Sequence, residues 1–387
     1  MTATRPPHNF LPAEYDRTAQ PRINHNYLSQ QFADYRDIFE KLAELVEAND
    51  FTLGRTVDRF ERAIAALLRA KHVVGVGSGT DALFLSLKAM GVGPGDEVIT
   101  TPYTFHSTVG AIGTTGARPV FADIGDDYNL DPAKVEAAIT PRTRAILPVH
   151  WSGRCCDMDA LGDIARRHDL RVVEDACHAI NASYKGKRPG TFGDTGCFSM
   201  HPLKNLNCWG DGGFIATDSD ELHDRLVLLR NHGLVSRDEC VLWGFNSRLD
   251  TVQAVVALHL LERIDHITER RQAHAKYLDE ALADIEGITV PTRDPEIEEV
   301  FHIYVVRCER RDALQRYLIE HDVDAKIHYP IPMHLQAAAK DLGYKEGDFP
   351  VAEATCKSVL SLPVHEFMTH EDLDYVVTQI RAFYAGS

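Results

Sequence analysis

The sequence lacks the features that mark several common classes of protein. It contains no run of about 18 apolar residues, so no membrane span is predicted. Its eight cysteines form no C-x-x-C pair, which argues against a zinc ribbon or a thioredoxin-type motif. Basic residues are in deficit, because 41 Lys and Arg stand against 57 Asp and Glu, and the net charge is −16. Nucleic acids and anionic membranes attract the opposite balance, so neither is an expected partner.

The N-terminal stretch MTATRPPHNFLPAEY has no apolar core, so no signal peptide is expected. We therefore predict a cytoplasmic protein with reduced thiols. The rest of the composition is that of a globular protein, with 44% hydrophobic and 25% charged residues among 387. At about 100–200 residues per domain, this length predicts two or three domains.

A regular alternation of strand and helix patterns follows an N-terminal arm of residues 1–26. Helical periodicity covers residues 35–48 and 55–70. Short β-rich segments then centre on Val74, Val98, Val120, Ile146 and Val172, with helical patterns such as 80–90 and 158–168 between them. This repetition predicts an α/β protein with a mainly parallel sheet covered on both faces. A ligand is expected beyond the carboxyl ends of the strands.

The pattern changes near residue 250. Helices are predicted within residues 251–283, a strand over 300–307 and a helix over 312–321. A last helix begins near Thr369, where Asp372 completes the spacing of a capping box. We interpret residues 27–259 as a large α/β domain and residues 260–387 as a small C-terminal α+β domain.

The segment VVGVGSGTDA at residues 73–82 is a strand that enters a glycine-rich turn and then a helix. Unpaired N–H groups at a helix start bind phosphate well. Gly77, Gly79 and Ala82 also fit the dinucleotide fingerprint G-x-G-x-x-A, but the next strand ends in threonines where that fingerprint needs an acid. A small phosphate ligand is therefore favoured over a dinucleotide and over a merely structural turn.

Two further segments carry side chains that can react. The strand RVVED at residues 171–175 ends in Glu174 and Asp175, which face either a cation or proton to be held, or solvent. Lys204 is either an ordinary surface lysine or an amine for Schiff-base chemistry, because dry surroundings favour loss of its proton. Its apolar neighbours in the sequence are Phe198, Pro202, Leu203, Leu206 and Trp209.

Together these three elements are the parts needed to hold pyridoxal phosphate. The glycine-rich turn would bind the phosphate, and Asp175 would keep the pyridine nitrogen protonated. Lys204, which lies 29 residues after Asp175, would form the Schiff base.

The motifs at these positions resemble those of the DegT/DnrJ/EryC1/StrS family of pyridoxal-phosphate-dependent sugar aminotransferases. They are SGTDAL at 78–83, EDA at 174–176, YKGKRPGTFGD at 184–194, FSMHPLKNLNCWGDGG at 198–213, LLRNHG at 228–233, GFNSRLD at 244–250 and HYPIPMH at 328–334. The resemblance runs from residue 27 to residue 384 and implies the type I, aspartate-aminotransferase-like fold with a mainly parallel seven-stranded sheet.

The resemblance also implies roles for individual residues. Lys204 looks like the Schiff-base lysine and Asp175 like the partner of the pyridine nitrogen. Gly79, Thr80 and Ser199 fall where the family binds the cofactor phosphate.

Two more cofactor contacts come from the resemblance. Phe105 falls where an aromatic ring stacks on the cofactor. Asn246, in GFNSRLD, matches an asparagine that reaches the phosphate of the neighbouring subunit. That role implies a homodimer with two shared active sites.

Three segments depart from the sequence that is common in the family. His178 stands where the family often has a glutamine against the ring hydroxyl of the cofactor, and His201 and Leu203 flank Pro202. The segment LNCWGDGG at residues 206–213 replaces the common LGAYGDGG. Because these changes border the substrate pocket, the substrate of any one family member does not transfer to this chain.

The histidine-rich loop HYPIPMH is a candidate substrate-binding segment. The resemblance places it near the mouth of the pocket, so His328, Tyr329 and His334 are candidate substrate contacts, together with His201. No third ligand accompanies His328 and His334, so no metal site is predicted. The other histidines and the cysteines are interpreted as structural.

These observations predict an aminotransferase that takes an amino group from Glu or Gln and transfers it to a keto-sugar, most simply one linked to a nucleotide. A keto-cyclitol aminotransferase is a rival within the same family. A sugar dehydratase with the same cofactor is less favoured, because those members replace the Schiff-base lysine by histidine. A non-catalytic regulator with this fold is disfavoured by the intact Lys204 and Asp175.

Overall fold

The central element of the computed structural model, which describes residues 21–386, is a seven-stranded sheet with the order β1-β8-β7-β5-β4-β2-β3. The strands are β1 (His72–Val76), β2 (Glu97–Thr100), β3 (Arg118–Phe121), β4 (Thr143–Leu147), β5 (Arg171–Asp175), β7 (Thr195–Ser199) and β8 (Gly213–Thr217). Only β8 runs antiparallel to its neighbours in this sheet. The mainly parallel α/β fold and the five strands expected between Val74 and Val172 are thus confirmed.

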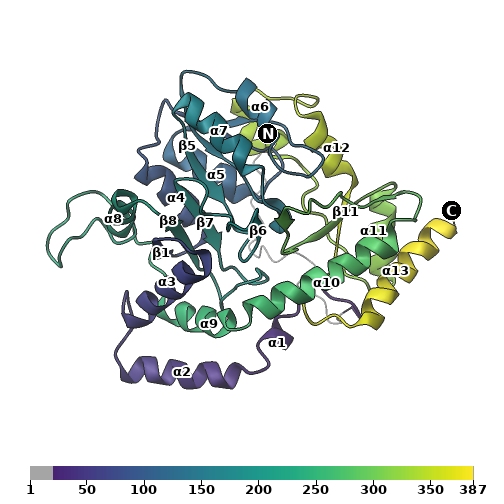
Figure 1. Ribbon diagram of the computed structural model, residues 1–387, viewed down its shortest axis with the longest axis horizontal. Helices are drawn as coiled ribbons and strands as arrows, with labels where there is room; N and C mark the ends of the chain where they lie inside the picture. The colour runs from purple at the N-terminus through teal and green to yellow at the C-terminus, as the bar shows by residue number, and fades with distance from the viewer. Residues whose placement is uncertain (1–20, 387) are drawn as a thin grey trace, which may run out of the picture.

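Helices cover both faces of this sheet (Figure 1). One face packs against α4 (Gly79–Ala89), α5 (His106–Thr115) and α8 (Asp220–Leu229). The other packs against α3 (Arg55–Leu68), α9 (Thr251–Leu261), α6 (Pro132–Ala137) and α7 (Met158–His168). Successive residues of one strand alternate between the two cores, so both sets of side chains must be apolar. This two-sided burial explains the short, continuous apolar segments in the sequence.

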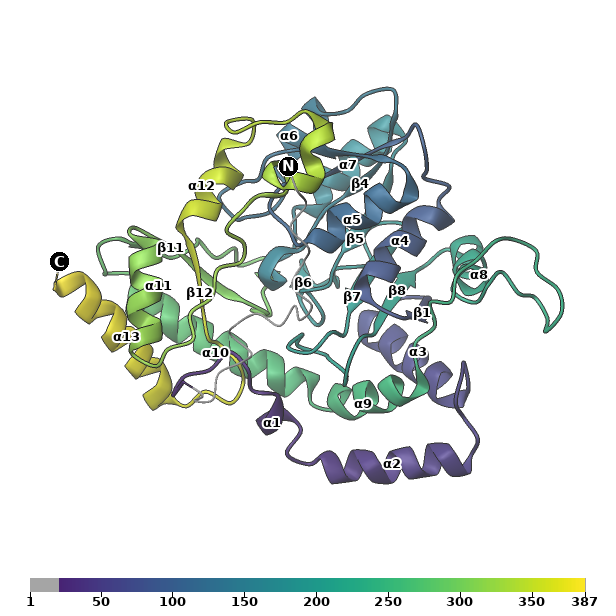
Figure 2. The same cartoon turned by 180° about the vertical axis from the view of Figure 1, so that it is seen from behind.

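The N-terminal part of the described chain runs across the molecule before it reaches the sheet. Residues 21–26 lead into α1 (Leu28–Gln31), and Ile23 pairs with Val323 of the C-terminal part. The next helix, α2 (Tyr35–Glu47), packs on α9 on the side that faces away from the sheet (Figures 1 and 2). Most of the predicted arm, residues 1–20, lies outside the described residues.

The C-terminal part has its own antiparallel sheet, in the order β12 (Val359–Leu362), β11 (Tyr304–Cys308) and β9 (Ile288–Thr289). It packs against α10 (Ile264–Leu282), α11 (Arg311–Glu320) and α13 (His370–Ala385). The short helix α12 (Pro350–Ser358) precedes β12, and β6 (Ser183–Tyr184) pairs with β10 (Ile297–Glu298). The predicted capping box of Thr369 and Asp372 is confirmed at the start of α13.

Helix α10 links the two cores. Its first turns contribute Ile264 and Ile267 to the core beside the large sheet, and its last turns contribute Leu278 and Leu282 to the C-terminal core. The domain boundary at residue 260 falls just before this helix and stays a prediction. No helix within residues 21–386 is long and apolar enough to cross a membrane.

The helices predicted within residues 251–283 are α9 and α10, which a turn at residues 262–263 separates. One predicted strand differs from the structure. The strand predicted over residues 300–307 begins only at Tyr304. Residues 300–303 are not in a ladder because Val300 and Ile303 donate their N–H groups to Gly153 and Ser152, at 3.2 and 3.4 Å. The apolar pattern reflects burial there, and the partner is a loop instead of a strand.

Candidate active site

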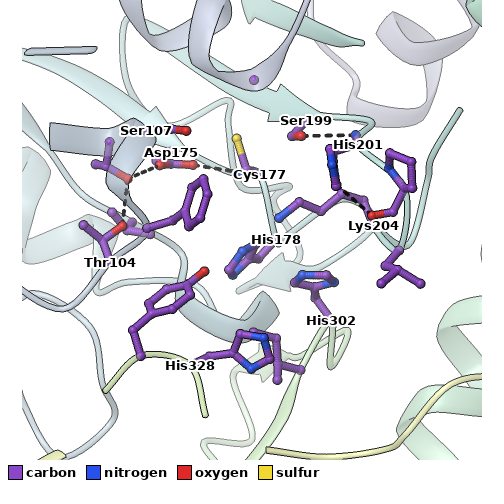
Figure 3. A pocket seen from close by; sticks show the side chains of 18 of the residues that line it. Thr104, Ser107, Asp175, Cys177, His178, Ser199, His201, Lys204, His302 and His328 are labelled. Carbon is purple, nitrogen blue, oxygen red and sulfur yellow. Dashed lines mark hydrogen bonds between the residues drawn. The ribbon is translucent and has the colours of Figure 1, made fainter. Parts of the chain in front are cut away.

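A pocket of about 460 Å³ lies beyond the carboxyl ends of β1, β2, β5 and β7, where the fold predicts a ligand. The C-terminal part closes its other side with residues such as His302 and His328 (Figure 3). The pocket brings together most of the predicted site residues, namely Gly79, Thr80, Phe105, Asp175, His178, Ser199, His201, Lys204, His328 and Tyr329.

The glycine-rich turn forms the start of α4. Ser78 is the N-cap, and its hydroxyl accepts a hydrogen bond from the backbone N–H of Asp81. A Cβ atom at Gly79 would lie only 2.7 Å from the Cβ atom of Ser199, so only glycine allows this approach of β7 to the helix start. Thr80 adds a hydroxyl that donates to Ser107 at 2.9 Å. The free N–H groups of the first turn and these hydroxyls suit a phosphate.

Asp175 ends β5 at the floor of the pocket and is 5% exposed. Its Oδ2 atom accepts a hydrogen bond from the Thr108 hydroxyl at 2.8 Å, and its Oδ1 atom accepts one from the N–H of Cys177 at 3.2 Å. These two donors stabilise an ionised carboxylate and hold it in one orientation. An ionised carboxylate at this position can keep a proton on a nitrogen atom of a bound ligand.

Glu174, the neighbouring acid, is fully buried and faces away from the pocket. Its carboxylate accepts hydrogen bonds from three backbone N–H groups of residues 190–193, at 2.6 to 2.7 Å, and contacts His150 Nε2 at 2.8 Å. The other ring nitrogen of His150 accepts from the N–H of Cys156, so the proton on Nε2 points at Glu174. The two acids of RVVED therefore separate into a structural residue, Glu174, and a pocket residue, Asp175.

Lys204 follows β7 on a loop, and its amine points into the pocket toward His178 (Figure 3). Within residues 21–386 this amine makes no hydrogen bond and no ion pair, while its backbone carbonyl accepts from Asn207 Nδ2 at 2.8 Å. Burial lowers the pKa of Lys204, although the nearby Cys177 and Asp175 act in the opposite direction. The side chain is thus an amine that more readily loses its proton and is free to react.

Four observations show that these residues fit pyridoxal phosphate. The start of α4 and Ser199 form a cradle for a phosphate, and a Cβ atom at Gly79 would fill this cradle. Asp175 offers a charge for the ring nitrogen, and Lys204 offers an unpaired amine for the aldehyde. The Nδ1 atom of His178 is buried without a hydrogen-bond partner in the described structure, which leaves it available to a polar group of a ligand.

Aromatic and imidazole rings form the remaining wall. Phe105 is 49% exposed, and its ring centroid lies 5.8 Å from that of Tyr329. His328 Nδ1 lies 2.9 Å from the Ser361 hydroxyl, and burial lowers the pKa of His328 to about 3. The pKa of His178 also lies well below its usual value because of burial and the nearby Lys204. Both imidazoles are therefore neutral at physiological pH.

Three other predicted site residues lie at the rim of the pocket or outside it. His201 is exposed at the rim of the pocket, where Nδ1 lies 2.9 Å from the carbonyl oxygen of Pro202. His334 does not line the pocket: it is 2% exposed, and its Nε2 lies 3.0 Å from the Glu353 carboxylate. The substrate contact predicted for His334 is thus not supported, because the loop turns this ring into the core. Asn246 is exposed, away from the pocket of its own subunit.

Sequence reasoning missed several residues that shape this site. Thr108 orients Asp175, and Arg271 of α10 donates from one guanidinium nitrogen to the carbonyl oxygens of Phe301 and His302, at 3.0 and 3.4 Å. Tyr27 donates its hydroxyl to the carbonyl of Leu203, beside Lys204. Tyr27 and Arg271 are distant in the sequence from the positions they hold. Thr108 lies eight residues after the end of β2, and that placement is the signal that could have identified it.

Comparison with known proteins gives consistent results. The chain is 44% identical over 363 residues to the "Pleiotropic regulatory protein" of Geobacillus stearothermophilus, with 92% of this chain and 97% of that protein covered. It is 40% identical over 367 residues to the dTDP-3-amino-3,4,6-trideoxy-alpha-D-glucose transaminase of Streptomyces venezuelae, with 94% and 97% covered.

A solved structure agrees with this similarity. The crystal structure of S. venezuelae DesV in complex with a ketimine intermediate superimposes with a TM-score of 0.92 and 40% identity. The match covers 94% of this chain and 99% of that one. The sequence pattern of the DegT/DnrJ/EryC1/StrS aminotransferase family matches residues 33–381 of this chain. By this match over nearly its whole length, the chain belongs to the DegT/DnrJ/EryC1/StrS aminotransferase family.

Proposed function

We propose that this protein is a pyridoxal-phosphate-dependent aminotransferase that transfers an amino group from Glu or Gln to a nucleotide-linked keto-sugar. The observation that carries the proposal is the unpaired amine of Lys204 in the same pocket as the oriented carboxylate of Asp175. Lysines that only stabilise a fold are typically ion-paired or solvated at the surface, whereas the amine of Lys204 is unpaired within residues 21–386 and points into the pocket.

When bound, pyridoxal phosphate supplies an aldehyde that carries the amino group and a ring that withdraws electrons from the substrate carbon. The start of α4, Thr80 and Ser199 would bind its phosphate. Asp175 would hold a proton on the pyridine nitrogen, and Phe105 would contact the ring. Lys204 Nζ would accept a proton as general base and donate it again as general acid.

The substrate class comes from the named relatives. A transaminase of a dTDP-linked amino sugar is 40% identical to this chain, and a UDP-N-acetyl-3-dehydro-alpha-D-glucosamine 3-aminotransferase of Acidithiobacillus ferrooxidans is 38% identical. The pocket offers neutral imidazoles and hydroxyls, which are suited to sugar hydroxyls. A keto-cyclitol offers similar hydroxyls and remains the rival substrate.

We also infer a homodimer with shared active sites. The segment after α8, residues 231–247, projects from the body of the subunit (Figure 1) and carries Trp243, which is 92% exposed. Phe245 and Asn246 of the same segment are exposed as well. An apolar projection of this kind suits an interface with a second copy, in which Asn246 would complete the phosphate site of the other subunit.

Complementation between two inactive variants tests the shared site. Lys204→Ala and Asn246→Asp, each first shown to be inactive alone, are co-expressed with different tags and purified as the mixed dimer. One of its two sites carries both changes and the other carries neither. About half of the activity per dimer should therefore return if the sites are independent. No recovery in a verified mixed dimer would refute the shared site, and a fully active monomer would refute the dimer.

The function itself is tested with a panel of dTDP- and UDP-linked keto-sugars and keto-cyclitols, each offered with Glu and with Gln. Products are identified by mass spectrometry. We expect amination of one sugar class by the wild-type protein and none by Lys204→Ala. Turnover by Lys204→Ala at a rate near that of the wild type would refute the role of Lys204.

A regulatory role is the second candidate, because a relative with 44% identity is named a regulatory protein. The same protein preparation distinguishes the two. If the cofactor-loaded wild type gives no change in its visible absorbance on addition of Glu or Gln, it does not accept an amino group and the regulatory role is favoured.

The eight cysteines are all free thiols, which suits the reducing conditions of the cytoplasm.

A further inference from the structure

The pocket contains more imidazole rings than the proposed reaction uses. Six histidines line it, and four of these have a hydrogen-bond partner in the protein. His25, His201 and His365 contact the carbonyl oxygens of Asp324, Pro202 and Asn24, respectively. His328 contacts the hydroxyl of Ser361. His178 and His302 differ from them, because neither ring forms a hydrogen bond within residues 21–386.

His178 and His302 lie against each other at the pocket wall, with ring centroids 4.4 Å apart (Figure 3). The Nδ1 atom of each ring is buried without a partner. A buried polar atom without a partner costs about 1–3 kcal/mol, and proteins tolerate that cost mainly where a ligand or water supplies the missing bond. The resemblance to the family assigns His178 to the ring hydroxyl of the cofactor, so His302 remains unassigned.

The backbone that carries His302 is fixed from three directions. Asn205, next to Lys204 in the sequence, donates to the carbonyl oxygen of Val300 at 2.9 Å. Arg271 donates to the carbonyl oxygens of Phe301 and His302. Ser152 accepts from the N–H of Ile303. An imidazole on such a braced segment is positioned before any ligand arrives, which lowers the entropy cost of binding.

The charge state of His302 narrows the kind of ligand. Burial lowers the pKa of His302 well below its usual value, and the nearby Lys204 acts in the same direction. The neutral ring has one nitrogen that donates and one that accepts. It therefore suits a hydroxyl group, which also donates and accepts, better than the carboxylates of an amino-acid donor, which need a cation or several donors.

We propose that His302 is a substrate-binding residue that forms a hydrogen bond with a hydroxyl group of the sugar and so favours the sugar over other amino-group acceptors. The inference rests on the proposed aminotransferase function and adds a residue to the sugar site. His302 acts on the sugar half of the reaction only. It takes no part in binding the amino-acid donor or the phosphate of the cofactor.

Equilibrium binding tests this role in the enzyme loaded with pyridoxamine phosphate, the cofactor form that does not react with an amino sugar. The probes are dTDP-3-amino-3,4,6-trideoxy-α-D-glucose, a UDP-linked 3-amino sugar, and the nucleotides dTDP and UDP alone, each measured by titration calorimetry. In His302→Leu the dissociation constant for the amino sugar that the wild type binds should rise about tenfold, the effect of one lost hydrogen bond. The dissociation constant for the matching free nucleotide should not change.

Two further variants separate binding from folding. His302→Gln keeps a group that donates and accepts at a similar distance, so its dissociation constant should stay within about threefold of the wild type. The matched control is His334→Gln, since His334 is also buried but lies outside the pocket. This control should leave the affinity for the amino sugar unchanged.

The donor reaction provides an independent readout. The rate at which Glu or Gln changes the cofactor absorbance should be the same in His302→Leu and in the wild type. If His302→Leu weakens the free nucleotide or the donor as much as the sugar, or leaves the sugar unaffected, the assignment of His302 is wrong. If the wild type binds neither amino sugar and accepts no amino group from Glu or Gln, the proposed function itself is wrong.

Discussion

The hydrogen bond from Thr108 to Asp175 gives a graded test of the site. Thr108 is 1% exposed, and its hydroxyl donates to Asp175 Oδ2 at 2.8 Å. That hydroxyl has a single proton, so the Thr104 hydroxyl, 2.7 Å away, must donate to Thr108. The chain Thr104–Thr108–Asp175 therefore has one direction, and Thr108→Val removes its central link while it keeps nearly the same shape.

The expected size of the effect comes from these contacts. A hydrogen bond to a charged group contributes about 1.5–3 kcal/mol, and each 1.36 kcal/mol of lost transition-state stabilisation lowers the rate about tenfold. Asp175 keeps its charge and its second donor, the N–H of Cys177 at 3.2 Å, so the lower end of this range applies. We expect kcat/KM of Thr108→Val to fall about tenfold. In Asp175→Asn, which removes the charge, kcat/KM should fall by a factor of about 10²–10⁴.

The assay compares kcat/KM of the wild type, Thr108→Ser, Thr108→Val and Asp175→Asn with the same sugar and donor. Thr108→Ser keeps the hydroxyl and should retain most of the activity. Thr108→Val leaves the buried Thr104 hydroxyl without its partner, so stability should also fall by about 1 kcal/mol. The reasoning is refuted if Thr108→Val matches the wild type, or if it is as inactive as Asp175→Asn while it still folds and binds the cofactor.

Three other predictions concern stability in the cofactor-free protein. Glu174→Gln should lower the free energy of unfolding in urea by about 3 kcal/mol, because the buried carboxylate accepts hydrogen bonds from three backbone N–H groups and an amide cannot replace all of them; an unchanged midpoint would contradict this role. Lys204→Met should melt at a higher temperature than the wild type near about pH 7. Burial lowers the pKa of Lys204, so the folded state binds the lysine proton less well than the unfolded chain does. The difference in melting temperature should therefore shrink as the pH rises toward about 10.4, the pKa of an unperturbed lysine. A difference that grows with pH would refute that sign. Asn207→Gly should lower the free energy of unfolding by about 2–3 kcal/mol. The fully buried Asn207 amide donates to the Lys204 carbonyl and to Gln31 Oε1, at 2.8 and 2.7 Å, and glycine is also more flexible in the unfolded chain. Equal urea midpoints would show that these bonds contribute nothing.

The sequence by itself determined the order of elements and the identity of the main reactive groups. The strands around Val74 and Val172 and the start of α13 at Thr369 were predictable because periodicity and caps involve residues close together in the chain. The edge of a parallel sheet collects whatever follows each strand. The turn at Gly79, the acid at Asp175 and the segment before Lys204 therefore had to meet in one pocket.

Only the tertiary structure decided which member of each pair of similar residues faces that pocket. Glu174 and Asp175 are adjacent, and a strand sends successive side chains to opposite faces, but only the packing of residues 190–193 shows which acid is structural. His328 lines the pocket while His334 turns toward Glu353. The placement of His302 likewise depends on α10 and on loops far away in the sequence. These outcomes rest on long-range hydrogen bonds and burial, which leave no periodic pattern in the sequence.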